Sequence, residues 1–226
     1  MDLVERTAGT ALFRGMSAKT VEDLVCRLNA VGRTYRRGEI LAHAGLEASR
    51  LFVLSSGRLH VYGERSGGRE MLVREIMPGE VLGLWILHVP EEKCWPGTVF
   101  AAEDAEVVSL GMAETRRLLA AGGRAAEQLS ANMSAILARE LFSTWRKLVV
   151  MDEPTVESRV QAYLAELAGR SGGSGEVVVP FDRERMAAYL GVTRPALSRA
   201  LGRLRDRGVL TWRKNSFRMC GRWTDR

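Results

Sequence analysis

Residues 191–210 read GVTRPALSRALGRLRDRGVL. Apolar residues recur in this stretch every three or four positions, which predicts a helix that starts after Thr193 and runs through Asp206. The predicted inward-facing residues are Leu197, Ala200, Leu201 and Leu204. Five arginines and a single aspartate fall in the same stretch. The helix therefore either presents a solvated basic face or binds a negatively charged partner.

The residues on both sides of this helix indicate a helix-turn-helix. The preceding sequence, FDRERMAAYLG, predicts a short helix with Asp182 as its N-cap and Gly191 as the turn residue after it. The following sequence, VLTWRKNSFRMC, predicts two short strands around Lys214 and Asn215. A short helix, a glycine turn, a basic helix and a basic hairpin form a winged helix-turn-helix, whose second helix enters the major groove of double-stranded DNA.

Positive charge is concentrated in the same region. Residues 181–226 carry twelve arginines and lysines and four acidic residues, whereas residues 1–180 have a small negative balance. A basic end on a nearly neutral body favours binding to a polyanion. A solubilising, arginine-rich face is the alternative interpretation, and charge alone does not distinguish the two.

The remaining composition argues against several classes of protein. The longest apolar run, residues 81–87, is far too short to span a bilayer, and the N-terminal residues lack the layout of a signal peptide. We therefore expect a cytoplasmic protein with no membrane partner. The cysteines, Cys26, Cys94 and Cys220, lie far apart and form no CxxC pair. This spacing argues against a disulfide framework and gives no zinc or iron–sulfur pattern.

Short alternating or β-branched runs, separated by glycine-containing turns, occupy residues 31–110. This texture predicts a small β-sandwich or barrel, with residues 66–68 at the tip of a hairpin.

A long helical stretch follows at residues 114–151, with glycines only near its start. Its apolar residues form a coiled-coil-like seam of Met133, Leu137, Leu141, Thr144, Leu148 and Met151. A second apolar face contains Leu129, Ile136, Phe142, Trp145 and Val149. A helix that is apolar on two faces favours a homodimer, in which one face packs on its own domain and the other on a partner. The alternative is a core helix within a single chain.

The sequence resembles the CRP/FNR family of bacterial transcription regulators over nearly its whole length. The residues that carry the resemblance are RLFVLSSGRLHVYGERSGGREMLVREIMPGEVLGL (50–84) and FDRERMAAYLGVTRPALSRALGRLRDRGVL (181–210). The resemblance implies an α+β fold: an N-terminal antiparallel, jelly-roll-like β-roll for effector sensing (1–112), a long dimerisation helix (113–151) and a C-terminal winged helix-turn-helix (152–226). It also implies a homodimeric, sequence-specific regulator whose partners are double-stranded DNA and RNA polymerase.

The resemblance assigns DNA contacts to individual positions. Arg194, Ser198 and Arg199 occupy the positions of an arginine, a serine and a second arginine that read DNA in the family, and Pro195 stands where a glutamate is usual. The complete set of candidate DNA-binding residues is Arg183, Thr193, Arg194, Ser198, Arg199, Arg203 and Lys214.

The effector pocket departs from that of the cyclic AMP binders. Alignment on Gly83 places Leu84 where they have a glutamate. Alignment backward from residues 105–107 places Trp95 and Pro96 where they have the arginine and serine that bind the cyclic phosphate. A charged phosphate beside these side chains would lose its partners, so we expect no cyclic AMP binding. The candidate pocket residues are Gly83, Leu84, Trp85, His88, Trp95, Phe100 and Met133, and a core filled by the same side chains is the alternative.

The sequence leads to different expectations for the iron–sulfur and haem cofactors found in the family. Cys26 stands alone, so we do not expect an iron–sulfur cluster. His88 and Cys94 lie close to the positions of the family's haem ligands, which leaves haem open beside a small organic effector.

Two further hypotheses remain beside an effector-controlled regulator. The first is a regulator that needs no ligand. The second is a metal-dependent, cupin-like enzyme, against which the ungrouped His43, His60 and His88 argue. We assign no catalytic residue and no metal ligand.

Overall fold

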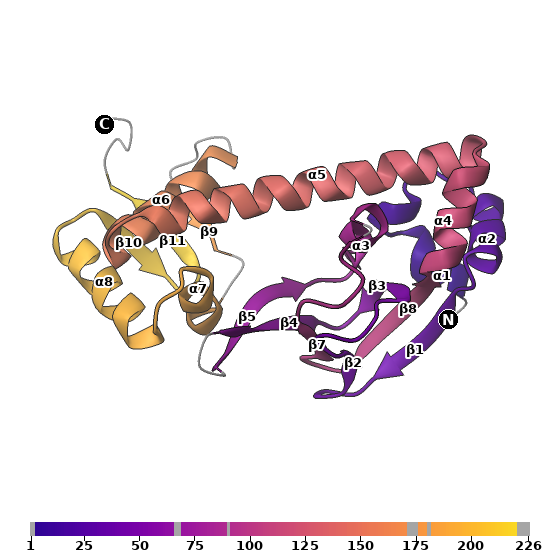
Figure 1. Cartoon of the computed structure of the whole chain (residues 1–226). Helices are drawn as coiled ribbons and strands as arrows, with labels where there is room; N and C mark the ends of the chain where they lie inside the picture. Colours follow the sequence, from indigo (N-terminus) through magenta and orange to yellow (C-terminus); the bar gives the residue numbers. More distant parts are fainter. Residues whose placement is uncertain (1–2, 66–68, 90, 171–175, 180–181, 221–226) are drawn as a thin grey trace. The chain divides into compact units, whose positions relative to one another are not determined.

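The computed structural model describes residues 3–65, 69–89, 91–170, 176–179 and 182–220. The chain divides into two compact units, residues 1–140 and 141–226. The boundary falls within the long helix α5 (Arg124–Asp152), which therefore contributes residues to both units (Figure 1).

The first unit is a β-roll of two antiparallel four-stranded sheets. One sheet has the strand order β1-β8-β3-β6 and the other β2-β7-β4-β5. The strands are β1 (Val31–Tyr35), β2 (Ile40–Ala42), β3 (Arg50–Ser56), β4 (Leu59–Arg65), β5 (Arg69–Ile76), β6 (Val81–Leu82), β7 (Thr98–Ala101) and β8 (Ala105–Gly111). The predicted hairpin tip at residues 66–68 lies outside the described residues.

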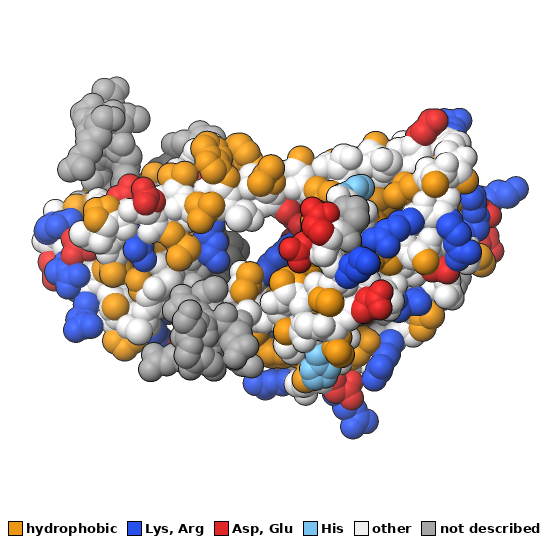
Figure 2. Space-filling model, in the orientation of Figure 1, with side chains coloured by type: hydrophobic (Ala, Val, Ile, Leu, Met, Phe, Trp, Pro, Cys, Tyr) orange, Lys and Arg blue, Asp and Glu red, His pale blue; other side chains and the backbone are white. Residues whose placement is uncertain are grey.

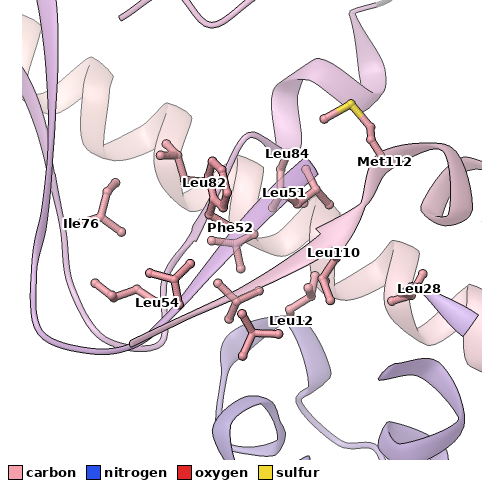
Figure 3. Close-up of a cluster of buried hydrophobic side chains, with 14 of the residues drawn as sticks. Leu12, Leu28, Leu51, Phe52, Leu54, Ile76, Leu82, Leu84, Leu110 and Met112 are labelled. Atoms are coloured by element: carbon pink, nitrogen blue, oxygen red, sulfur yellow. The ribbon is translucent and has the colours of Figure 1, made fainter. Parts of the chain in front are cut away.

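Short helices close the β-roll. They are α1 (Leu3–Ala8), the 3-10 helix η1 (Ala11–Phe13), α2 (Ala18–Arg27), α3 (Leu84–His88) and α4 (Met112–Ala121). Leucines from η1, α2, α3 and both central strands of one sheet converge on a single buried cluster (Figure 3). In β3, the four consecutive residues 51–54 are all buried, so both faces of this central strand are covered.

The long helical stretch predicted for residues 114–151 is interrupted. Gly122 and Gly123 adopt φ angles of +70° and +91°, which ends α4 at Ala121 and starts α5 at Arg124. Glycine takes such left-handed conformations readily, whereas two of them in succession cannot continue a right-handed helix.

The second unit contains the end of α5 and a winged helix-turn-helix. Its further elements are α6 (Val156–Arg170), β9 (Glu176–Val178), α7 (Arg183–Tyr189), α8 (Arg194–Asp206), β10 (Leu210–Arg213) and β11 (Ser216–Met219), and its sheet has the order β10-β11-β9. The four predicted inward-facing residues of α8 are all buried, together with Met186 and Leu190 of the α7 region and Phe217 of β11. The α+β fold class, the β-roll and the winged helix-turn-helix are therefore confirmed.

No helix in the described part of the chain has the length and apolar character needed to cross a membrane. Among the same residues, no group of three or more histidine, cysteine or acidic side chains is placed to hold a metal ion. Cys26, Cys94 and Cys220 are free and exposed.

Candidate nucleic-acid interface

Local hydrogen bonds fix the start of both helices of the helix-turn-helix. The Asp182 carboxylate accepts from the Arg185 backbone N–H at 2.8 Å, and the Thr193 hydroxyl accepts from the Ala196 N–H at 3.4 Å. Gly191 turns the chain between the helices with a φ of +67°. A Cβ at this position would also approach the Met151 Cε to 3.1 Å. Thr193 therefore acts as an N-cap, and its hydroxyl is engaged in orienting α8.

The exposed face of α8 holds three of the candidate DNA-binding side chains. Arg194, Ser198 and Arg199 are all exposed, because the inward stripe of the helix occupies the other side. Arg194 has one distant ion pair, its Nη1 lying 3.7 Å from Glu184 Oε2. Within the described residues, Arg199 makes no hydrogen bond or ion pair through its side chain, so its five N–H donors are available to an outside acceptor.

Arg203 is held within its own domain. Its Nε donates to Glu157 Oε1 in the first turn of α6, and Arg207 Nη1 lies 3.0 Å from Glu157 Oε2. The hydrogen bond from Arg203 is the main reason why the pKa of Glu157 lies below its ordinary value. Glu157 was not among the sequence candidates, and no local pattern marks it, because Arg203 lies 46 positions away.

Arg183 supports the wing hairpin, which we define as β10, β11 and the turn at Lys214 and Asn215. Its Nη2 donates to the Lys214 carbonyl at 2.9 Å, and its guanidinium lies 4.6 Å from the centre of the Phe217 ring. The Trp212 ring is approached by Arg183 at 5.8 Å and by Arg205 of α8 at 5.2 Å. Burial lowers the pKa of Arg183. Much of this guanidinium is therefore occupied by protein contacts.

Lys214 lies at the tip of the wing with an exposed side chain. Its φ of +53° is in the left-handed region, which a residue with a Cβ adopts only at a cost in conformational energy. The Arg183 hydrogen bond to its carbonyl helps to hold this conformation. The turn thus leaves the Lys214 side chain open to solvent.

The candidate effector residues do not all converge. Trp95 is buried, stacks on Phe52 with ring centres 5.4 Å apart, and meets Trp85 edge-on at 6.4 Å. A Cβ on Gly83 would lie 3.0 Å from the Trp95 ring, so the indole fills the space above that glycine. Leu84 and Met133 are buried in the same core cluster. These contacts favour the filled core over an open pocket at Trp95.

Phe100 and His88 lie elsewhere. Phe100 is on the outward face of β7, where it stacks on Tyr62 at 5.0 Å and meets His60 edge-on. His88 is exposed at the end of α3, and Cys94 is exposed in the loop that follows. A hollow of about 310 Å³ beside this loop is lined by Glu47, Ala48, Ile86, Lys93 and Arg116, none of which was a sequence candidate.

The candidate dimer residues separate into two groups. Met133 is only 1% exposed and belongs to the core of its own chain, and Leu137 is partly buried against that core. Leu141, Thr144 and Leu148 are exposed, with Leu141 at 73% and Leu148 at 60%. Phe142, Trp145 and Val149, which the sequence placed on a second face, are exposed as well. Figure 2 shows hydrophobic side chains at the surface over this half of α5.

Comparison with known proteins finds a family match in each of the two parts of the chain. Residues 32–121 match the cyclic nucleotide-binding domain, and residues 158–221 match the Crp-like helix-turn-helix domain. The transcriptional activator protein FnrA of Stutzerimonas stutzeri is 25% identical over 84% of this chain and 75% of its own length. The nitrogen fixation regulation protein FixK of Rhizobium meliloti is 27% identical over 80% of this chain and 78% of its own.

Solved structures give the same fold. The c-di-GMP responsive global regulator CLP of Xanthomonas campestris superposes with a TM-score of 0.66, at 20% identity, over 91% of this chain and 100% of its own. The match to the cyclic nucleotide-binding domain covers the β-roll, and the match to the Crp-like helix-turn-helix domain covers the winged helix-turn-helix.

Proposed function

Because the chain belongs to the CRP/FNR family of transcription regulators, we propose that it binds specific operators as a homodimer, through α8 and the wing of each protomer. Like its relatives, it is a DNA-binding regulator and not an enzyme. The cupin-like alternative is therefore wrong. The observation that carries the finer proposal is the exposed face of α8, where Arg199 is free of any described partner.

The chemistry of this face suits a major groove. A guanidinium bonds bidentately to the O6 and N7 atoms of guanine, and Arg199 has its donors available for that contact. Ser198 and Arg194 lie on the same exposed face and would contact neighbouring bases or phosphates. Lys214 at the wing tip would contact phosphate, and such contacts set the register of the helix in the groove.

The exposed face of α5 supports a symmetric dimer. Six exposed positions on this helix alternate in steps of three and four residues, which is the heptad spacing of a coiled coil: Ala131, Ser134, Ala138, Leu141, Trp145 and Leu148. Ala131 and Ser134 line part of a hollow of about 440 Å³ at the start of α5, where a second helix could approach closely. The proposed interface thus keeps Leu141 and Leu148 of the predicted seam, with Thr144 at its edge, and omits the buried Met133.

We propose that effector sensing and DNA binding belong to separate parts of the chain, as the sequence indicates. The β-roll within residues 1–112 and the helix within 113–151 receive an effector signal, and residues 152–226 bind DNA and present the bound dimer to RNA polymerase in the cytoplasm. The filled space around Trp95 also favours the alternative of a regulator that binds its operator without a ligand.

Selection of binding sites from a pool of random duplexes tests the main proposal. We expect enrichment of a two-fold symmetric sequence with guanine in each half-site, and half-site centres about one helical turn, or roughly 10 base pairs, apart. A footprint on the enriched duplex should cover both half-sites. Recovery of no common sequence, or of a single unpaired half-site, would contradict dimeric operator recognition.

Cyclic AMP should not bind. The positions that would carry the phosphate-binding arginine and serine hold Trp95 and Pro96, and the buried indole occupies the space. Titration calorimetry with cyclic AMP should therefore show only heats of dilution, and operator affinity should be the same with and without the nucleotide. Stoichiometric binding with a defined enthalpy would show that the β-roll opens in a way that this conformation does not provide.

A further inference from the structure

Glu157 binds two arginines at the same time, Arg203 in the last turn of α8 and Arg207 at its C-cap. One carboxylate oxygen accepts from Arg203 Nε and the other lies 3.0 Å from Arg207 Nη1. The Glu157 side chain is only 19% exposed, because it lies where α6 and α8 meet. Both oxygens therefore have an arginine partner, and the hydrogen bond from Arg203 is the main cause of the lowered pKa of Glu157.

The two arginines continue the line of the candidate base-reading residue. Arg199, Arg203 and Arg207 are four residues apart, so they lie one turn after another along one side of α8. Arg199 has no side-chain partner among the described residues, whereas the next two are paired with the same carboxylate. Arg199 is thus a guanidinium without a described partner, whereas Arg203 and Arg207 share a single carboxylate.

Arg203 is nevertheless 56% exposed and Arg207 is similarly open to solvent. Without the carboxylate, both side chains would have the length and freedom to reach a DNA phosphate near the major groove. Phosphate contacts add affinity for every sequence equally, so two further contacts would strengthen binding to random DNA as much as binding to an operator.

We infer that Glu157 is a specificity-determining residue, which withholds Arg203 and Arg207 from the phosphates of double-stranded DNA and so keeps non-specific binding low. This inference rests on the proposed function, in which α8 enters the major groove. It also removes Arg203 from the set of direct DNA contacts that the sequence suggested.

Replacement of the carboxylate by an amide tests the inference on random-sequence duplex DNA, which needs no knowledge of the operator. In Glu157→Gln, binding should become more salt-dependent, by roughly 0.9 in the log–log slope for each additional phosphate that an arginine neutralises and so by about 2 per protomer. The variant should then lose about tenfold more affinity per bound protomer, and so about a hundredfold more as a dimer, than the wild type between about 50 and 200 mM salt.

Glu166→Gln is the matched control. Glu166 lies on the same helix and pairs with Arg146 of α5 at 3.4 Å, so its replacement makes the same change of net charge without releasing an arginine of α8. An equal steepening of the slope in both variants would show a general charge effect and overturn the inference.

Removal of the arginines gives a second test that does not depend on how well a Glu157 variant folds. In the wild-type background, Arg203→Ala with Arg207→Ala should change the slope by less than about half a unit, because neither side chain contacts phosphate. In the Glu157→Gln background, the same pair should return the slope to its wild-type value. A clear loss of slope in the wild-type background would show that the arginines already contact DNA, and the inference would fail.

The outcomes also separate this inference from the proposed function. If the wild type enriches a symmetric operator but Glu157→Gln leaves the slope unchanged, only the role of Glu157 is wrong. If the wild type binds neither selected nor random duplexes, DNA recognition through α8 is wrong, and the role assigned to Glu157 falls with it.

Discussion

Leu148→Glu is expected to convert the protein from a dimer to a monomer. Leu148 is exposed in a single chain and is the last of the six heptad positions proposed for the interface on α5. In a two-fold symmetric pair, each copy would place its carboxylate close to the same residue of the partner, in an interface that excludes water. An uncompensated buried charge costs about 3–5 kcal/mol. The dissociation constant should then rise by at least about a hundredfold.

Sedimentation velocity at micromolar concentration measures the effect directly. Ser143→Glu provides the matched control, because Ser143 is exposed on the same helix but lies about half a turn away from the heptad face. The control should sediment as the wild type does. If Leu148→Glu also stays dimeric, with unchanged helical content, the exposed face of α5 is not the interface and the symmetric docking proposed above loses its basis.

The affinity for the operator should also decrease when Leu148→Glu separates the two protomers. Each monomer would hold one half-site, so the second half-site no longer contributes as an intramolecular event of high effective concentration. Loss of dimerisation with full operator affinity would argue that one winged helix-turn-helix is sufficient.

The helix-turn-helix could be predicted from the sequence because its determinants are local. The caps at Asp182 and Thr193, the turn at Gly191 and the apolar stripe of α8 all act within a few residues. Because these signals do not depend on distant residues, the two helices and the wing are confirmed with nearly the predicted bounds.

The roles of individual arginines could not be predicted in the same way. Whether a basic side chain is free depends on what lies beside it in space, and the partners of Arg183 and Arg203 come from 31 and 46 positions away. A sequence pattern cannot show that Arg183 lies on Phe217, nor that a carboxylate of α6 takes up Arg203. Among the described residues, Arg199 differs from them only in lacking such a neighbour.

The seam on α5 shows a second limit. Its apolar residues fit more than one register, and only the β-roll decides which face is covered within the chain. The β-roll buries Met133 and Ile136 with Leu129, so the face left for a partner begins with small residues, which a search for apolar periodicity passes over.

Arg199→Ala is expected to abolish the preference for guanine at one position of each half-site. The side chain is exposed, its donors have no partner in the described residues, and α8 is held rigidly by its buried stripe. One bidentate arginine–guanine contact contributes about 1–3 kcal/mol of discrimination. Affinity for the selected operator should therefore fall by about 5- to 150-fold per half-site. Affinity for random DNA should change little.

Lys214→Ala provides the contrast, because the two side chains are expected to act through different chemistry. Loss of a phosphate contact at the wing weakens binding to every sequence by a similar factor and lowers the magnitude of the salt slope by about 0.9 per protomer. A comparison of operator and base-substituted duplexes, each across a salt titration, distinguishes the two variants. Base preference that survives in Arg199→Ala would mean that sequence is read by Arg194 or Ser198. In that case the free guanidinium at position 199 serves the DNA backbone, and the operator's guanine must be assigned to another side chain of the same exposed face.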